Sequence, residues 1–305
     1  MIRDLGIVGA GTTGRGIAQT TAQAGINVVF CEVSEEKVAE AIAGITATLD
    51  TEIERWGLTK TEKIVILSRI RGTTKYEELQ AVPLVIEAVG DELELKSDVF
   101  HALDKVMSPE AILVTNTSSL SITQLAAVTN RADRVVGMHF SLPVPKRPLV
   151  EVVRGLHTSD ETVQRVKEFA CDIKKTAIEV FEYPGFLTTR LILPLINEAM
   201  HVVMEGVANA KDVDTAMVLG YNFPQGPLEL ADRVGLDEVL RWMEHLFREL
   251  GDLKYRPCPL LRKMVRAGNL GVKTGRGFFV YDNRGRHVRE NVSGIFRISH
   301  PGPTI

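Results

Sequence analysis

Two segments place polar side chains directly after short apolar runs. Ser118 lies in the polar stretch 115–119, which follows the apolar run 112–114, and His139 follows the run 135–138. Glu151 comes soon afterwards and is flanked by valines. An imidazole paired with a carboxylate suits alcohol oxidation, because the imidazole takes the hydroxyl proton while the carboxylate fixes its tautomer. These residues therefore predict acid–base chemistry on a hydroxyl group.

Each of these residues also has a structural explanation. A lone histidine at the end of a strand is more often packed or solvated than catalytic. Glu151 differs, since a carboxylate among valines is costly to bury without a hydrogen-bonding partner. The catalytic interpretation therefore depends on elements that bring the three side chains together.

Such elements are indicated by short apolar runs that alternate with amphipathic stretches. Strands are expected at residues 5–8, 27–31, 84–87, 112–115, 135–138, 149–153 and 177–180. Helices are expected between them at residues 14–24, 35–55, 92–106 and 161–174. Almost continuously apolar strands are typical of a parallel sheet buried on both faces, so the pattern predicts a doubly wound α/β sheet. Ligands of such sheets bind beyond the carboxyl ends of the strands.

A glycine-rich turn follows the first predicted strand. Gly9, Gly11 and Gly14 form a G-x-G-x-x-G pattern with Thr12 and Thr13 inside it, directly before a helix. In this context the glycines allow a tight turn and close approach of a pyrophosphate, which the start of the helix attracts. Glu32 ends the second strand, where an acid accepts hydrogen bonds from the adenosine ribose and repels a 2′-phosphate. We therefore predict a Rossmann-type domain that binds NAD rather than NADP.

The character of the chain changes at Pro184 and Gly185. Beyond them the spacing of apolar residues is helical, with helices expected at residues 186–205, 210–219, 227–234, 237–250 and 259–267. We predict an α/β Rossmann domain over residues 1–183, an all-α domain over residues 184–282, and a polar tail over residues 283–305.

Composition excludes several classes of protein. The formal charge of −3 argues against a nucleic-acid binder, and no apolar run is long enough to cross a membrane. The three cysteines lie far apart without a CxxC pair, so neither a disulfide framework nor a zinc site is expected. No metal is predicted, and the cytoplasm is the expected compartment.

Several longer motifs carry a resemblance to a known family. The chain resembles the short-chain L-3-hydroxyacyl-CoA dehydrogenases, which include bacterial 3-hydroxybutyryl-CoA dehydrogenases, over roughly residues 5–281. The motifs are the glycine turn and the segments at 86–89, 116–120, 139–145, 149–153, 184–190, 194–199, 226–230 and 273–278.

The resemblance implies roles for individual residues. It makes His139 the base, Glu151 its partner, and Ser118 a hydrogen-bond donor to the substrate oxygen. It places Glu87, Lys96 and Asn116 in the cofactor site, with Lys96 near the nicotinamide ribose. It also implies a homodimer formed through the helical domain and a role in fatty acid metabolism.

Two positions depart from the family pattern. Leu142 stands where the family usually has an asparagine between His139 and Pro143, and Thr189 replaces the asparagine that helps to hold the substrate carbonyl. Thr189 keeps a hydroxyl with shorter reach and remains a candidate catalytic-site residue. The loss of one hydrogen-bonding group costs about 1–3 kcal/mol.

The leading hypothesis is NAD-dependent oxidation of a (3S)-3-hydroxyacyl-CoA to the 3-ketoacyl-CoA, or the reverse reduction. One alternative is the same hydride transfer on a free 3-hydroxy acid of the sugar-acid or carnitine type, which the two departures would fit. Another is a non-catalytic NAD-binding relative, against which the joint presence of Ser118, His139 and Glu151 argues.

Overall fold

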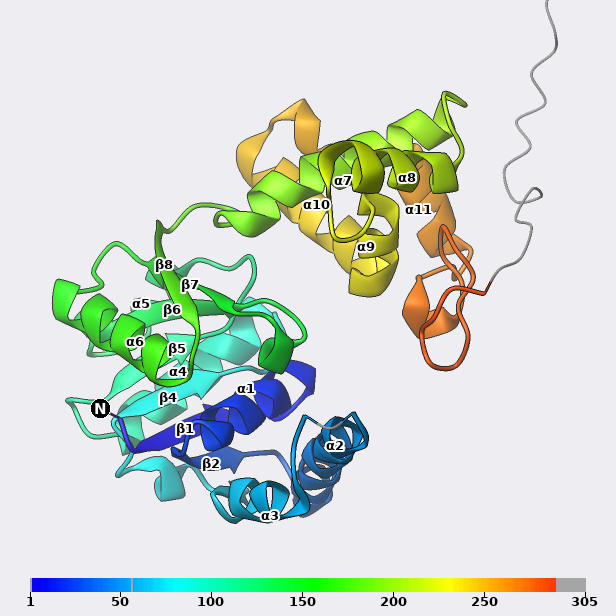
Figure 1. The fold of residues 1–305 in the computed structure, drawn as a ribbon. Coiled ribbons are helices and arrows are strands. Elements are labelled where there is room, and N and C mark those ends of the chain that lie inside the picture. The colour runs from blue at the N-terminus through cyan, green and yellow to red at the C-terminus, as the bar shows by residue number, and fades with distance from the viewer. Residues whose placement is uncertain (1, 56, 289–305) are drawn as a thin grey trace, which may run out of the picture. The chain divides into compact units, whose positions relative to one another are not determined.

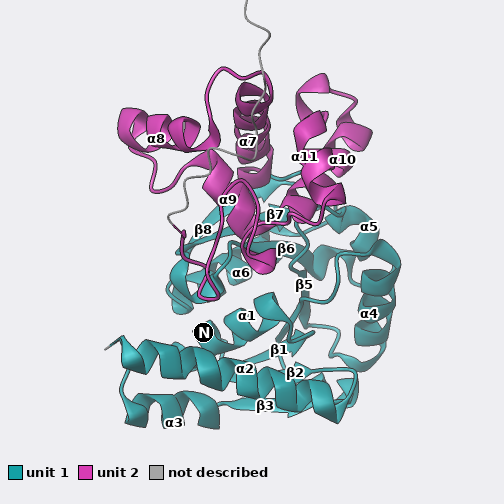
Figure 2. Ribbon diagram, turned by 90° about the vertical axis from the view of Figure 1, so that its right-hand side faces the viewer, with its two compact units in different colours: residues 1–186 teal, residues 187–305 magenta. Residues whose placement is uncertain are grey.

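The computed structural model describes residues 2–55 and 57–288. The chain forms two compact units, residues 1–186 and 187–305 (Figure 2). Most of the predicted polar tail, residues 289–305, lies outside the described residues. Within them, no helix combines the length and the apolar character that a membrane span requires.

The first unit is built on one eight-stranded sheet with the strand order β3-β2-β1-β4-β5-β6-β7-β8 (Figure 1). Neighbouring strands are parallel except for β6 and β7, which are antiparallel. The predicted α/β class is confirmed. The strands are β1 (Asp4–Val8), β2 (Asn27–Cys31), β3 (Ile70–Thr73), β4 (Leu84–Glu87), β5 (Ile112–Thr115), β6 (Val135–Phe140), β7 (Leu149–Arg154) and β8 (Thr176–Phe181).

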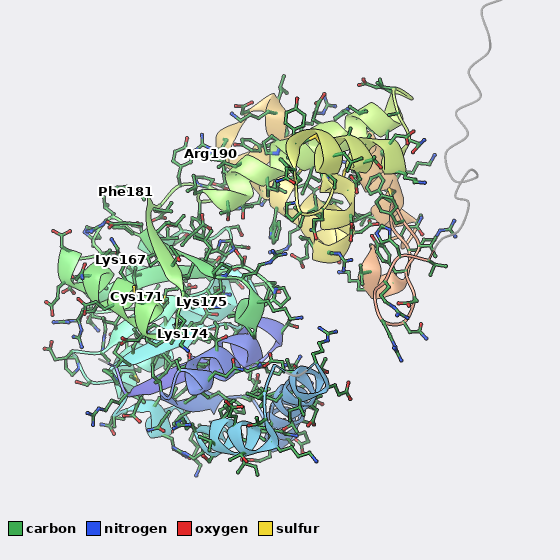
Figure 3. The ribbon with its side chains drawn as sticks, in the orientation of Figure 1. Lys167, Cys171, Lys174, Lys175, Phe181 and Arg190 are labelled. Atoms are coloured by element: carbon green, nitrogen blue, oxygen red, sulfur yellow. The ribbon has the colours of Figure 1, made fainter. Side chains whose placement is uncertain are left out.

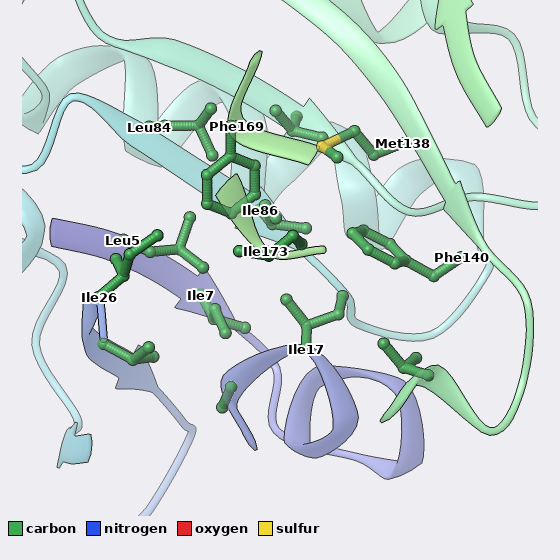
Figure 4. Close-up of a cluster of buried hydrophobic side chains, with 14 of the residues drawn as sticks. Leu5, Ile7, Ile17, Ile26, Leu84, Ile86, Met138, Phe140, Phe169 and Ile173 are labelled. Atoms are coloured by element: carbon green, nitrogen blue, oxygen red, sulfur yellow. The ribbon is translucent and has the colours of Figure 1, made fainter. Parts of the chain in front are cut away.

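Helices cover both faces of this sheet. One face packs against α1 (Thr12–Gln23), α2 (Glu35–Glu54) and α6 (Asp160–Asp172), and the other against α4 (Leu93–Val106) and α5 (Ile122–Ala126). On the first face, Ile17 and Phe169 meet apolar side chains from β1, β4 and β6 (Figure 4). The central strands, such as β4 and β5, are thus buried on both faces, which explains their apolar runs.

Three short elements of the first unit were not predicted: α3 (Lys60–Ser68), β3 and α5. β3 reads Ile-Arg-Gly-Thr at the edge of the sheet, with Arg71 exposed and Gly72 half-buried. A short edge strand that faces solvent lacks the apolar run that marks a buried strand.

The direction of β7 is a second difference from the expected sheet. Residues 141–148 join β6 to β7, and a parallel crossover needs a dozen or more residues. β7 therefore returns antiparallel to β6, and this reversal decides the geometry of the site described below.

The second unit is helical, as predicted. Its core combines buried side chains such as Leu193, Leu228, Met243 and Leu261 with Tyr255 and Phe278, which lie outside the α-helices. The helices are α7 (Thr188–Met204), α8 (Ala210–Tyr221), α9 (Pro227–Val234), α10 (Leu236–Leu250) and α11 (Pro259–Arg266).

A buried carboxylate, that of Asp232 on α9, holds the last part of this unit. It accepts hydrogen bonds from the backbone N–H groups of Phe278 and Phe279, at 3.0 and 2.9 Å, and from the Tyr281 hydroxyl at 3.0 Å. A Cβ at Gly277 would overlap the same carboxylate, so only glycine fits there. Burial raises the pKa of Asp232 to about 6, although its three donors favour the ionised form.

This raised pKa predicts a pH-dependent stability. The folded chain binds the Asp232 proton more tightly than the unfolded chain, so the free energy of unfolding falls as pH rises from about 4 to about 6. The rise of the Asp232 pKa from 3.8 to about 6 corresponds to a change of about 3 kcal/mol in the free energy of unfolding across this pH range. Urea unfolding of the parent and of Asp232→Asn across this range measures it. Parallel stability curves for the two proteins would contradict the assignment.

Candidate active site

His139 and Glu151 face each other across the antiparallel pair β6·β7. They are direct partners in the strand register, and the His139 Nδ1 lies 2.5 Å from the Glu151 Oε2. The Glu151 side chain is 1% exposed and that of His139 is 13% exposed. A carboxylate that accepts the Nδ1 proton leaves the Nε2 lone pair of the imidazole as a base. The predicted pair is therefore present with the geometry of an oriented general base.

Glu151 lies inside β7, within the strand that the sequence predicted and between buried neighbours. The sequence did not predict that β7 runs antiparallel to β6. The reversal of β7 brings it opposite His139. The ring of Phe186 lies 5.9 Å from that of His139, in a tilted arrangement.

Asn116 and Ser118 lie in the loop after β5, at the carboxyl end of that strand and close to the end of β6. The strands β5 and β6 are parallel neighbours, with Thr115 opposite Gly137. The Asn116 Oδ1 accepts the backbone N–H of Phe140 at 3.1 Å, which ties this loop to the residue after His139. Ser118 therefore follows the carboxyl end of β5, as the sequence predicted. The strand β6 is longer than the expected residues 135–138, because it pairs with β7 as far as Phe140, so His139 lies within the paired residues of the strand rather than after it.

Asp91 is a polar residue of this region that the sequence analysis missed. It lies between β4 and α4, and its carboxylate accepts the hydroxyl protons of Thr117 at 2.6 Å, and of Ser118 and Ser119 at 3.1 Å each. The signal was present, because Asp91 follows the carboxyl end of β4 as Ser118 follows that of β5. We call Asp91, Thr117, Ser118 and Ser119 the Asp91 cluster.

Glu87 and Lys96 form a buried ion pair next to the Asp91 cluster, with the Lys96 Nζ 3.8 Å from the Asp91 Oδ1. The Lys96 Nζ lies 2.6 Å from the Glu87 Oε1, and the two side chains are 1% and 0% exposed. The other Glu87 oxygen accepts the Thr115 hydroxyl at 2.8 Å. Burial raises the pKa of Glu87, and the nearby Lys96 opposes that shift. Both residues were predicted to bind the cofactor, and in this structure they bind each other.

The glycine turn after β1 has the shape that a dinucleotide needs. Gly9 has a φ of 88°, and a Cβ at Gly14 would overlap the Gly9 carbonyl oxygen. A Cβ at Gly11 would meet nothing within 4 Å, so the backbone there borders open space. The helix α1 begins at Thr12 and Thr13 with no side-chain cap. A phosphate could therefore take the hydrogen bonds of its first N–H groups.

Glu32 lies beside this turn at the end of β2. Its Oε1 accepts the backbone N–H of Ala10 at 2.5 Å, which fixes the carboxylate against the glycine turn. These residues fit an adenosine ribose and the pyrophosphate of NAD, whose hydroxyl groups and negative charge they complement.

The loop between β6 and β7 is held by Lys175, which follows α6 (Figure 3). The Lys175 Nζ donates to the carbonyl oxygens of Val144 and Arg147, at 2.5 and 2.8 Å. Burial lowers the pKa of this lysine. The same loop packs on α1 at Gly16, where a Cβ would lie 2.9 Å from that of Val144.

The two departures from the family pattern lie in different units. Leu142 is in the loop after His139 and its side chain is 52% exposed. Thr189 is the second residue of α7 in the helical unit and is buried. Across residues 2–55 and 57–288, no group of three or more His, Cys, Asp or Glu side chains is placed to hold a metal ion.

Comparison with known proteins identifies the family of the chain. Residues 4–183 match the model of the 3-hydroxyacyl-CoA dehydrogenase NAD-binding domain, and residues 185–281 match that of the C-terminal domain of the same enzymes. The chain belongs to the 3-hydroxyacyl-CoA dehydrogenase family. Its first unit is therefore the NAD-binding domain of that family, and the predicted fold and cofactor are confirmed.

Individual relatives are similar over nearly their whole length. A probable 3-hydroxybutyryl-CoA dehydrogenase of Bacillus subtilis is 47% identical over 93% of this chain and 99% of its own. A 3-hydroxybutyryl-CoA dehydrogenase of Bradyrhizobium diazoefficiens is 45% identical over 93% and 97%. The crystal structure of an (S)-3-hydroxybutyryl-CoA dehydrogenase from Ralstonia eutropha is 48% identical and covers 92% of this chain and all of its own, with a TM-score of 0.88.

Proposed function

We propose that this member of the family catalyses the NAD-dependent interconversion of (3S)-3-hydroxyacyl-CoA and 3-ketoacyl-CoA. The observation that carries the proposal is the pair of His139 and Glu151, whose side chains lie 2.5 Å apart. The pair lies at the end of the sheet where the parallel strands terminate, as the glycine turn does. General bases held by a carboxylate are suited to removing the proton of an alcohol. A non-catalytic relative would have no need to keep this pair together with Ser118.

Each candidate residue has a separate role in the proposed reaction. The His139 Nε2 accepts the proton of the 3-hydroxyl group, and Glu151 stabilises the resulting imidazolium across the 2.5 Å contact. Ser118 donates a hydrogen bond to the oxygen on C3, where negative charge develops. NAD, when bound, supplies the acceptor for the hydride from C3. In the reduction, His139 returns the proton to the same oxygen.

We assign the predicted cofactor residues to three parts of NAD. Gly9, Gly11 and Gly14, with Thr12 and Thr13 at the start of α1, bind the pyrophosphate, and Glu32 binds the adenosine ribose. Lys96 and Asn116 belong to the nicotinamide end. Glu87, which is fully buried, supports Lys96 through their ion pair.

The substrate is proposed to be short, in keeping with the relatives named for 3-hydroxybutyryl-CoA. Oxidation of NADH with acetoacetyl-CoA, longer 3-ketoacyl-CoAs and free 3-keto acids tests both the chain length and the need for CoA. We expect the highest kcat/KM with acetoacetyl-CoA. Activity confined to free keto acids would reject the CoA substrate.

The preference for NAD over NADP is expected to depend on Glu32. Glu32→Ser removes the charge that repels a 2′-phosphate, so the ratio of the Kd values for NADPH and NADH should fall by about tenfold, or about 1.4 kcal/mol. NADH should itself bind more weakly, because the ribose loses its acceptor. Fluorescence titration measures both. Glu36→Ala, which removes an exposed acid at the start of α2, is the control and should leave the ratio unchanged. Equal affinity of the parent for both cofactors would contradict the assignment.

The second candidate substrate is a free 3-hydroxy acid, which the departures at Leu142 and Thr189 favour. If CoA is the substrate, Leu142→Asn combined with Thr189→Asn restores the family pattern. The activity on acetoacetyl-CoA should then rise about tenfold, as one hydrogen bond worth roughly 1.4 kcal/mol is regained in the transition state. If the chain acts on a free acid, the same change should lower activity on that acid. Kinetics of the single and double variants on both substrate classes decide between them.

We also propose a cytoplasmic homodimer that forms through the helical unit. That unit exposes large apolar side chains on α7 and α8, among them Leu191, Leu219 and Tyr221, which a second copy would bury. The three cysteines, all within the described residues, are free thiols, as a reducing compartment favours. Light scattering of the purified protein, with Leu219→Lys as the interface variant, tests the dimer.

A further inference from the structure

The loop between β6 and β7, residues 141–148, joins the strands that carry His139 and Glu151. These two residues are partners in the antiparallel ladder, and Phe140 with Val150 is the last pair before the loop. The register of two antiparallel strands depends on the geometry of the segment that connects them. The conformation of this loop therefore affects how the imidazole and the carboxylate meet.

The loop is held by an ammonium group from outside it. The Lys175 Nζ donates hydrogen bonds to the carbonyl oxygens of Val144 and Arg147, at 2.5 and 2.8 Å, and the lysine side chain is 7% exposed. One carbonyl lies in the middle of the loop and the other near its end. A buried carbonyl that loses its donor is destabilised, so this conformation of the loop depends on Lys175.

A lysine is a costly donor at this position. Burial of an ammonium group is unfavourable unless an anion compensates its charge, and within residues 2–55 and 57–288 no carboxylate forms an ion pair with Lys175. Hydrogen bonds from a charged donor are shorter and stronger than those from a neutral one. The lysine therefore contributes a rigid loop rather than a favourable ion pair.

Two other contacts fix the surroundings of the loop independently of the Lys175 side chain. Val144 packs on α1 at Gly16, where a Cβ would lie 2.9 Å from that of Val144. The backbone N–H of Thr176, the first residue of β8, donates to the carbonyl oxygen of Pro148 at 2.7 Å. Loss of the Lys175 ammonium should therefore loosen the loop while the sheet keeps its pairing.

We propose that Lys175 is a positioning residue that acts on catalysis through the β6–β7 loop and the pair of His139 and Glu151. By fixing two carbonyl groups of the loop, it holds the Glu151 carboxylate against the imidazole. Hydrogen bonds weaken steeply as their geometry departs from the optimum, so a looser loop gives a less well oriented base. The inference rests on the proposed function, which makes His139 the base.

A double-mutant cycle tests whether Lys175 acts through Glu151. The variants are Lys175→Met, Glu151→Gln and their combination, assayed with acetoacetyl-CoA and NADH. We expect Lys175→Met to lower kcat by about tenfold and to change the KM for acetoacetyl-CoA by less than about threefold, because orientation of the base is lost rather than a contact with substrate. In the Glu151→Gln background the same change should cost less than about twofold in kcat, since the carboxylate that the loop positions is gone. Losses that multiply in the double variant would overturn the proposal.

Further measurements separate positioning from other roles of Lys175. The NADH affinity of Lys175→Met, measured by fluorescence, should stay within about twofold of the parent. A large loss would overturn the proposal, because the loop would then act through α1 and the cofactor. Lys174→Met, the same change at the exposed neighbouring residue (Figure 3), is the matched control and should leave kcat at the parent value.

Two outcomes distinguish failure of this inference from failure of the proposed function. A parent protein that turns over no 3-ketoacyl-CoA contradicts the proposed function and with it this inference. An active parent with independent losses contradicts the inference alone. If Lys175→Met does not fold, Lys175→Gln, which keeps an N–H donor, replaces it in the cycle. Coupling to Glu151 then supports the proposal, and equal losses with and without the Glu151 carboxylate overturn it.

Discussion

His139→Gln should lower kcat by about 10²- to 10⁴-fold while NADH still binds with the affinity of the parent. Glutamine fills a similar volume but cannot accept the proton of the 3-hydroxyl group, and loss of a general base has an effect of this size. Stopped-flow or steady-state oxidation of NADH with acetoacetyl-CoA measures kcat, and fluorescence titration measures the cofactor affinity. Activity within a few-fold of the parent across the pH range would show that His139 is not the base.

Two companion variants sharpen this result. Glu151→Gln should also lose rate, because a neutral amide orients the imidazole less well and stabilises its cation less across the 2.5 Å contact. His101→Gln changes an exposed histidine on α4 and is the matched control, with activity expected at the parent level. If Glu151→Gln kept full rate, the pair would be structural rather than catalytic.

Lys96→Met should destabilise the NAD-binding domain by about 3–5 kcal/mol at neutral pH, the cost of leaving a buried charge without its partner. The charge is that of Glu87, whose side chain is fully buried. Burial already raises the pKa of Glu87, and loss of Lys96 raises it further. The folded variant therefore takes up a proton more readily than the unfolded chain, so its penalty should be smaller at pH 5 than at pH 8.

Urea unfolding at the two pH values measures this penalty. The combination Lys96→Met with Glu87→Gln removes both charges and should recover much of the lost stability, since no uncompensated charge remains. Lys105→Met, an exposed position on the same helix, controls for the loss of a lysine and should stay within about 0.5 kcal/mol of the parent. A pH-independent penalty that the double variant does not relieve would mean that Lys96 stabilises the domain by packing.

The buried strands and the cofactor turn could be predicted because their signals are local. Strands such as β1 and β5 are almost continuously apolar since both faces of the sheet are covered, and this shows in the residues themselves. Gly9 and Gly14 are glycines for reasons of local backbone geometry, namely a positive φ and a contact that leaves no room for a Cβ. The edge strand β3 escaped prediction because exposure removes that apolar signature.

The candidate reacting residues could also be recognised in the sequence. Which side chains contact one another was decided by the tertiary structure. His139 and Glu151 stand twelve residues apart, and only the short loop that forces β7 back against β6 makes them neighbours. Asp91 gave no local sign of its partners, because its bonds to Thr117, Ser118 and Ser119 join the segment after β4 to the segment after β5. The pairing of Lys96 with Glu87 lies within one strand–helix unit, but it depends on how α4 packs back against the end of β4. Hydrogen bonding among buried polar groups depends on distances across the sheet, which residue spacing along the chain does not encode.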